Sequence, residues 1–174
     1  MIRMIARYGL KVWSDWDTTA TGQTAGQWAF ELKPLDHAED AFLADGRETN
    51  ITSDRLELLA FVRGLEALDD PCWVYLSTES QYVRHGLKYG IGRWKQNEWR
   101  WENAGIWVPV KHADLWKRVD RAMDIHRLAW RRGTAIDGAA NDFAGYRQKA
   151  QSQRERRPMR SWSHQSRDAA VLVA

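Results

Sequence analysis

Three stretches near the start of the chain have the polar and apolar pattern of β-strands. Residues 6–14 are rich in strand-forming side chains, residues 27–32 alternate between polar and apolar positions, and residues 38–44 form a third candidate. Such alternation is typical of a half-buried strand. Because short connections join the three stretches, they predict an antiparallel meander. The polar segment from Asp15 to Gly26 is expected to be a turn.

Helical periodicity begins after Thr52, a residue type that is favoured as an N-cap. Apolar residues recur at helical spacing through residues 54–68, which predicts an amphipathic helix. Residues 72–77 form a short apolar run of strand type, and residues 80–97 have a helical pattern that glycines interrupt. These segments predict a strand between two helical regions.

The last elements are predicted at residues 114–126, 128–130 and 141–153, as a helix, a strand and a helix. A strand, a helix and a strand in succession imply a parallel crossover. The pattern therefore predicts an α/β fold. Its mixed five-stranded sheet has three antiparallel strands followed by parallel strands, and helices flank it.

Length and composition narrow the class of protein. The 174 residues indicate one domain, expected at residues 1–150, and a basic C-terminal tail at residues 151–174 that we expect to be mobile. No apolar run approaches the roughly 20 residues of a membrane span, and the N-terminus lacks a secretory pattern. The single cysteine, Cys72, excludes an internal disulfide and a cysteine-based zinc site. We expect a cytoplasmic monomer without a membrane partner.

Charge is distributed unevenly along the chain. Residues 1–83 carry a net charge of −7, and residues 84–132 carry +7. This layout is consistent with a carboxylate site beside a surface that binds a polyanion. Ordinary solvated charge is the alternative interpretation.

Three acidic residues occupy positions that the predicted fold brings together. Asp15 ends the first strand, Glu57 lies in the first turn of the first helix, and Glu79 follows the fourth strand. Neighbouring carboxylates repel one another unless cations bind them, and oxygen ligands favour Mg²⁺ or Mn²⁺. Two such ions would suit phosphodiester hydrolysis. Alternatively, these are surface acids, and Glu57 complements the helix dipole.

Several motifs in the right order carry a family resemblance. Residues 52–60 and 64–68 resemble the first-helix signature of type 1 ribonuclease H, and residues 76–83 resemble its next motif. Residues 86–99 and 110–119 resemble the family's basic handle and the helix after it. The resemblance implies a ribonuclease H-like fold and an endoribonuclease that uses two metal ions to hydrolyse the RNA strand of an RNA–DNA hybrid.

The resemblance also implies a set of metal-binding and catalytic carboxylates. Asp15 matches the family's first aspartate, Glu57 matches its helix glutamate, and Glu79 stands where the family has an aspartate. The fourth position is open: Asp142 is the acid near enough to fill it, Asn141 occupies it in one register, and in another it is empty.

Nucleic-acid-binding residues are implied in two groups. Three residues match positions that line the minor groove of the hybrid: Ser53, Asp54 and Gln81. A basic and aromatic cluster in the handle combines three tryptophans, Trp94, Trp99 and Trp101, with Arg93, Lys95 and Arg100. Its predicted binding residues are Arg93, Trp94, Lys95 and Arg100. An alternative interpretation is that Trp94 and Trp99 pack the handle helix onto the domain.

Departures at the chemical positions leave other functions open. Trp16 replaces a small residue after the first aspartate, and Asp17 is either a spare ligand or a turn residue. A degenerate module that binds hybrid or duplex without cutting it is one alternative. An exonuclease of the same superfamily that uses Asp15 and Asp17 is another.

Overall fold

The computed structural model describes residues 5–18, 22–130 and 143–156. The chain divides into two compact units, Met1–Phe143 and Ala144–Ala174. Asp142 and Asn141 lie outside the described residues, as does the part of the predicted tail that follows residue 156. The identity of the residue at the fourth carboxylate position and the mobility of the tail therefore stay predictions.

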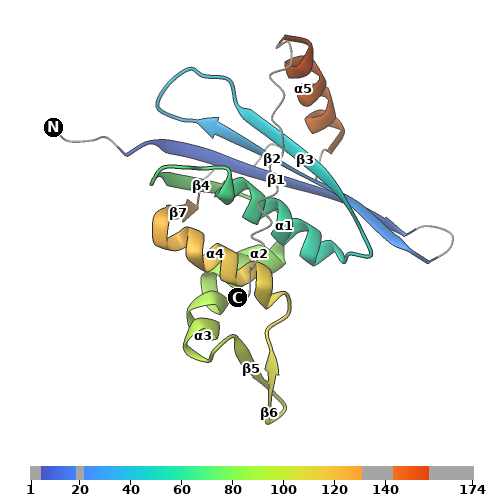
Figure 1. The fold of residues 1–174 in the computed structure, drawn as a ribbon, viewed down its shortest axis with the longest axis vertical. Helices are drawn as coiled ribbons and strands as arrows, with labels where there is room; N and C mark the ends of the chain where they lie inside the picture. Colours follow the sequence, from blue (N-terminus) through green and yellow to red (C-terminus); the bar gives the residue numbers. More distant parts are fainter. Residues whose placement is uncertain (1–4, 19–21, 131–142, 157–174) are drawn as a thin grey trace, which may run out of the picture. The chain divides into compact units, whose positions relative to one another are not determined.

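The first unit contains the mixed five-stranded sheet that the sequence predicts. Its strand order is β3-β2-β1-β4-β7 (Figure 1). β1 (Arg7–Thr18), β2 (Thr24–Pro34) and β3 (Phe42–Thr49) are antiparallel. β4 (Trp73–Ser77) pairs in parallel with β1, and β7 (Arg127–Trp130) pairs in parallel with β4. The predicted fold class is confirmed.

The first two strands extend further than their hydrophobic pattern indicates. Their ladder runs from the pair Tyr8–Pro34 to the pair Thr18–Thr24, so most of the segment expected to be a turn is paired strand. Backbone N–H and C=O groups form this ladder, and their pairing does not require apolar side chains. Similarly, β3 begins at Phe42, where pairing with Leu32 of β2 starts, and not at residue 38.

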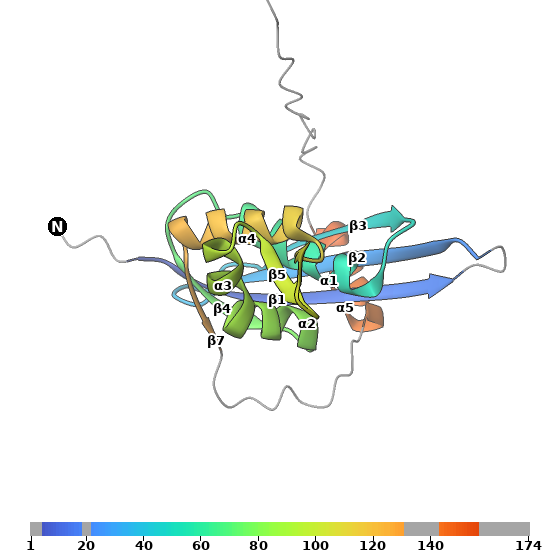
Figure 2. The ribbon, with the colours of Figure 1, turned by 90° about the horizontal axis from the view of Figure 1, so that it is seen from below.

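Helix α1 (Ser53–Glu66) lies across β1 and β2, and α4 (Ala113–Ile125) lies beside it (Figures 1 and 2). The Thr52 hydroxyl accepts a hydrogen bond from the Arg55 N–H at 3.4 Å and caps α1 as predicted. Buried residues cover more than one face of α1 because the helix contacts the sheet, α2 (Gln81–His85) and α4. They include Leu56, Leu58, Leu59, Phe61, Val62 and Leu65.

Glycines do not break the helical segment that follows β4. The path continues through α2 (Gln81–His85), a π-helical turn (Gly86–Gly90) and α3 (Ile91–Gln96). A Cβ on Gly86 would lie 2.3 Å from the Trp116 ring, and one on Gly90 would lie 2.4 Å from the Trp94 ring. Both glycines are therefore needed for the close approach of an indole.

Two glycines of this segment should respond oppositely to substitution. Gly86→Ala should lower the free energy of unfolding by about 2 kcal/mol, because the new methyl group overpacks the core against Trp116. Gly92→Ala is the matched control: a Cβ added there would have nothing within 4 Å, and the higher helix propensity of alanine should add up to about 1 kcal/mol. Urea denaturation measures both values. Equal effects of the same sign would contradict the packing account.

A short hairpin follows α3 that the hydrophobic pattern does not predict. β5 (Arg100–Asn103) and β6 (Ile106–Pro109) pair antiparallel. The turn residues Ala104 and Gly105 have φ values of 50° and 82°, and positive φ at both positions is the mark of a type I′ turn.

The second unit contains α5 (Phe143–Arg156), which confirms the predicted C-terminal helix. The domain boundary expected at residue 150 falls inside this helix and stays a prediction. Among the described helices, none combines the length and the apolar composition needed to cross a membrane.

Cys72 and His126 form a buried pair beside the start of β4 and the end of α4. They are 2% and 3% exposed, and the Cys72 Sγ lies 3.4 Å from the His126 Nδ1. Burial raises the pKa of the Cys72 thiol to about 11 and lowers the pKa of His126 below its ordinary 6.5. Both groups are therefore held in their neutral forms.

This pair predicts a loss of stability in mild acid. Because folded His126 binds a proton less readily than unfolded His126, the free energy of unfolding should fall as the pH drops through 6.5. The fall should end once His126 is protonated in the folded state. Urea denaturation across this range checks the slope. His126→Gln should reduce the slope more than His37→Gln, which removes a surface histidine. An equal reduction would contradict the assignment.

Candidate active site and nucleic-acid interface

Asp15 lies on β1 beyond the part of this strand that pairs with β4. In the ladder with β2, Asp15 is opposite Gln27, and its neighbour Ser14 is opposite Trp28. Side chains alternate between the two faces of a strand. Ser14 contacts α1, so Asp15 points to the other face, where Gln27 is in turn opposite Arg47 of β3.

Glu57 reaches β1 at the position next to Asp15. The Ser14 hydroxyl, which belongs to a residue that is 5% exposed, lies 3.4 Å from the Glu57 Oε1 in donating geometry. Glu57 lies just beyond the first turn of α1, in which the sequence predicted it, because the helix begins at Ser53 and Asp54 is the acid of that turn. The contact joins this part of α1 to the middle of β1. Asp15 and Glu57 therefore approach one stretch of β1 from opposite faces of the sheet.

Glu79 lies in the connection between β4 and α2. The pairing of β1 with β4 ends at Lys11 and Ser77, two residues before Glu79. The Ser80 N–H donates to the Thr78 hydroxyl at 3.1 Å, and the Ser80 hydroxyl accepts from the Val83 N–H at 3.2 Å. These bonds on both sides of Glu79 define the path of the backbone where β1 and β4 separate.

The three acids supply suitable donors for a hard divalent ion, since carboxylate oxygens are the ligands that Mg²⁺ and Mn²⁺ prefer. Their positions do not complete a metal site. Within the part of the chain that the structure describes, which leaves out Asp142, no three histidine, cysteine or acidic side chains are grouped to hold a metal ion. Asp15, Glu57 and Glu79 thus come from adjacent elements without forming a cage.

The residues predicted to contact the minor groove lie at two neighbouring helix starts. Ser53 and Asp54 begin α1, Gln81 begins α2, and these helices contact each other. Asp54 is not free, because its Oδ2 accepts a hydrogen bond from the Lys111 Nζ at 2.7 Å. Lys111 in turn offers its carbonyl oxygen to the Tyr82 hydroxyl at 2.9 Å.

His112 and Arg55 extend this junction, although neither is among the binding residues predicted from the motifs that contain them. The Arg55 guanidinium forms two hydrogen bonds with Asp114, at 2.9 and 2.6 Å, and these hold the pKa of the Asp114 carboxyl below its usual range. His112 lies 3.4 Å from Thr52 Oγ1 and from Arg55 Nη1, and burial lowers its pKa. Its φ of 57° is the signal of a constrained position, and the sequence alone does not reveal it.

The residues of the predicted handle cluster have separate roles. The Lys95 Nζ pairs with Asp120 at 2.9 Å, and an Arg100 Nη2 donates to the Trp107 carbonyl at 2.9 Å. Trp94 and Trp99 pack against the hydrophobic core, which confirms the packing interpretation for both. Arg93 lines a cavity together with Trp94.

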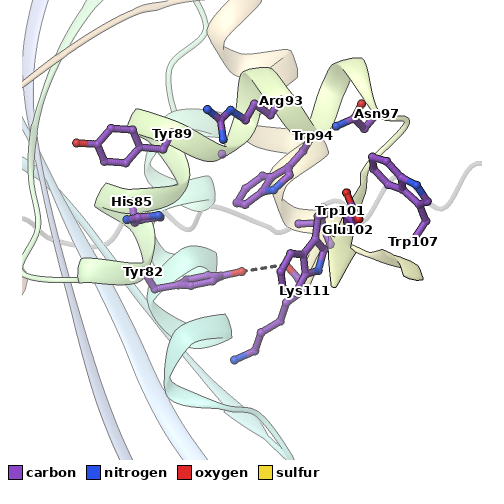
Figure 3. A pocket seen from close by; sticks show the side chains of 12 residues that line it. Tyr82, His85, Tyr89, Arg93, Trp94, Asn97, Trp101, Glu102, Trp107 and Lys111 are labelled. Carbon is purple, nitrogen blue, oxygen red and sulfur yellow. Dashed lines mark hydrogen bonds between the residues drawn. The ribbon is translucent and has the colours of Figure 1, made fainter. Parts of the chain in front are cut away.

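This cavity opens between the helical segment and the β5–β6 hairpin, and its volume is about 590 Å³ (Figure 3). Aromatic rings dominate its lining, and cationic side chains accompany them. The aromatic residues are Tyr82, Tyr89, Trp94, Trp101 and Trp107, the cationic ones are Arg93 and Lys111, and His85, Asn97 and the acidic Glu102 also line the cavity. The arrangement suits a ligand with flat rings and negative charge.

Comparison with known proteins decides the family. The family model for RNase H matches residues 12–152, which include α1, β4 and the part of β1 that carries Asp15, together with Glu57 and Glu79. The chain belongs to the ribonuclease H family. This confirms the resemblance found in the sequence motifs.

Relatives within the ribonuclease H family share part of the chain. It is 44% identical over 86 residues to the Ribonuclease H of Pseudomonas fluorescens (strain Pf0-1), and the match covers 49% of this chain and 54% of that protein. The chain thus spans about half the length of the curated relatives that it matches.

Solved structures show the same fold. LC9-RNase H1, a type 1 RNase H with the type 2 active-site motif, matches with a TM-score of 0.54 at 18% identity, over 75% of this chain and 65% of that one. The foamy viral protease-reverse transcriptase in complex with RNA/DNA hybrid matches with a TM-score of 0.52 at 12% identity, over 76% of this chain and 18% of that one.

Proposed function

We propose that this ribonuclease H family chain is an endoribonuclease that hydrolyses the RNA strand of an RNA–DNA hybrid with Mg²⁺ or Mn²⁺. One observation carries the proposal. The family match contains Asp15, Glu57 and Glu79, and the Ser14–Glu57 contact places Glu57 against the strand residue next to Asp15. The basic stretch that follows β4 supplies a surface for the phosphate backbone.

Under this proposal, Asp15, Glu57 and Glu79 would hold the ions, which requires the Asp15 side chain to reach around β1 to the face of Glu57. Asp142, Asn141 or no residue fills the fourth position. When bound, the ions would activate a water molecule and stabilise the leaving oxygen. Ser53, Asp54 and Gln81 would face the minor groove, where 2′-hydroxyl groups distinguish RNA from DNA. Arg93, Lys95 and Arg100 would contact the backbone of the hybrid, whereas Trp94 packs against the core beside them.

The test is incubation of the pure, folded full-length chain with an RNA–DNA hybrid labelled on the RNA strand, with either ion. We expect internal cuts in the RNA strand, no cuts in a DNA duplex of the same sequence, and no reaction in chelator. A ladder from one end would instead support an exonuclease. Binding without cleavage under both ions would support the non-catalytic module and overturn the proposal. The monomeric state and the cytoplasmic location stay predictions.

A further inference from the structure

We infer that the cavity between the helical segment and the β5–β6 hairpin binds an unpaired nucleobase from a single-stranded extension that adjoins the hybrid. The inference rests on the proposed function, because it takes the substrate to be a nucleic acid. It adds one feature of that substrate, an unpaired end or gap. Cleavage at the carboxylate site does not require this feature.

The shape of the cavity favours a flat ring over a double helix. Its volume of about 590 Å³ lies in the range of sites that take small molecules, which is enough for one nucleoside. In a duplex each base is already stacked between its neighbours, so a pocket of this kind cannot receive it. An unpaired base has free faces that stack on aromatic side chains.

The hairpin presents its aromatic side chains without covering them. Trp101 and Trp107 line the cavity and are 44% and 48% exposed, although large apolar side chains are usually buried. The hydrogen bond from Arg100 to the Trp107 carbonyl and the ladder between β5 and β6 hold this edge of the cavity. Trp94 lies across the cavity from Trp107 in Figure 3, with its ring packed so closely on Gly90 that a Cβ there would lie 2.4 Å from it.

Charge favours a nucleic acid over an apolar peptide. Residues 84–111 contain six lysines and arginines and two glutamates, a net charge of +4. Arg93 stands at the cavity itself, where a phosphate joined to the stacked base could meet it, whereas the Lys111 ammonium is paired with Asp54 at 2.7 Å. Aromatic faces with interspersed cations are the usual composition of surfaces that bind single strands.

The experiment measures binding by fluorescence anisotropy in chelator, so that no strand is cut. It compares a blunt hybrid, the same hybrid with a short thymidine extension on the DNA strand, and the same hybrid with an abasic extension of equal length. We expect the thymidine extension to tighten binding about 10-fold, which corresponds to one stacked base. The abasic extension carries the same phosphates and should give little of this gain.

Variants test whether the tighter binding of the tailed hybrid depends on the cavity. Trp107→Ala and Trp101→Ala should each reduce the affinity ratio of tailed to blunt hybrid toward one. Trp130→Ala, which removes a tryptophan that is 41% exposed on β7, is the matched control and should keep the full ratio. Circular dichroism confirms that each variant is folded.

Three results would overturn the inference: equal binding of tailed and blunt hybrid, equal gain from the abasic extension, or an unchanged ratio in both hairpin variants. A chain that cuts hybrid and ignores the extension refutes this inference alone. A chain that binds the extension through Trp107 but cuts no hybrid refutes only the proposed activity.

Discussion

Asp15→Asn should abolish cleavage of the RNA strand, with a loss on the order of 10³-fold in turnover. A metal ligand contributes several kcal/mol to the stabilisation of the transition state, and each 1.36 kcal/mol is worth tenfold in rate. Asparagine keeps the shape of the side chain but removes the charge that balances a divalent ion. Turnover of labelled hybrid at saturating substrate, with Mg²⁺ and with Mn²⁺, measures the effect.

Asp17→Asn is the matched control for this substitution. Asp17 is two residues further along β1, on the same face as Asp15, and its Oδ1 accepts a hydrogen bond from the Thr18 N–H at 2.7 Å. This local contact is consistent with a backbone role, so we expect turnover to change by only a few-fold. Equal losses in both variants, or an Asp15→Asn variant with nearly full turnover, would contradict the assignment of Asp15 as a ligand.

The largest effect on stability is expected from Trp116→Ala. The Trp116 side chain is fully buried, its Nε1 donates to the Tyr82 hydroxyl at 2.9 Å, and its ring lies 5.3 Å from that of Trp94. Truncation would leave a large cavity and remove the partner of a half-buried hydroxyl. Comparable truncations of tryptophan cost about 4 kcal/mol.

Urea denaturation of the full chain measures this loss directly. Trp130→Ala should change the free energy of unfolding by less than about 0.5 kcal/mol, since substitutions at exposed positions are usually small in effect. Trp116→Ala should also weaken the packing of Trp94 beside the cavity. A loss below about 1 kcal/mol would show that the surroundings collapse into the space, contrary to our expectation.

Much of the fold follows from patterns that are local in the sequence. The helix at residues 54–68 combines a capping threonine with apolar positions at helical spacing, and the structure places α1 there. The β5–β6 hairpin was missed because its strands are only four residues long, too short for alternation to be distinctive. Its turn depends on positive φ at Ala104, a residue that has no preference for that conformation.

The candidate site shows a different limit of sequence reasoning. Motif matching names Asp15, Glu57 and Glu79, but it does not say from which side of the sheet each one approaches. That information depends on the pairing register, which places Ser14 against Glu57 and turns Asp15 away. The ion pair between Asp54 and Lys111 cannot be predicted from the sequence either, because 57 residues separate the two partners.

Because Ser14 and Asp15 face opposite sides of the sheet, the number of residues in β1 has to stay fixed during evolution. A one-residue deletion between Leu10 and Ser14 would keep the composition of the strand almost unchanged, yet it would move every later side chain to the opposite face. Ser14 would then leave Glu57, and Trp16 would lose the hydrogen bond that its Nε1 donates to the Ile51 carbonyl at 2.8 Å. Insertions and deletions should therefore be rejected along β1 even at positions where most substitutions are accepted.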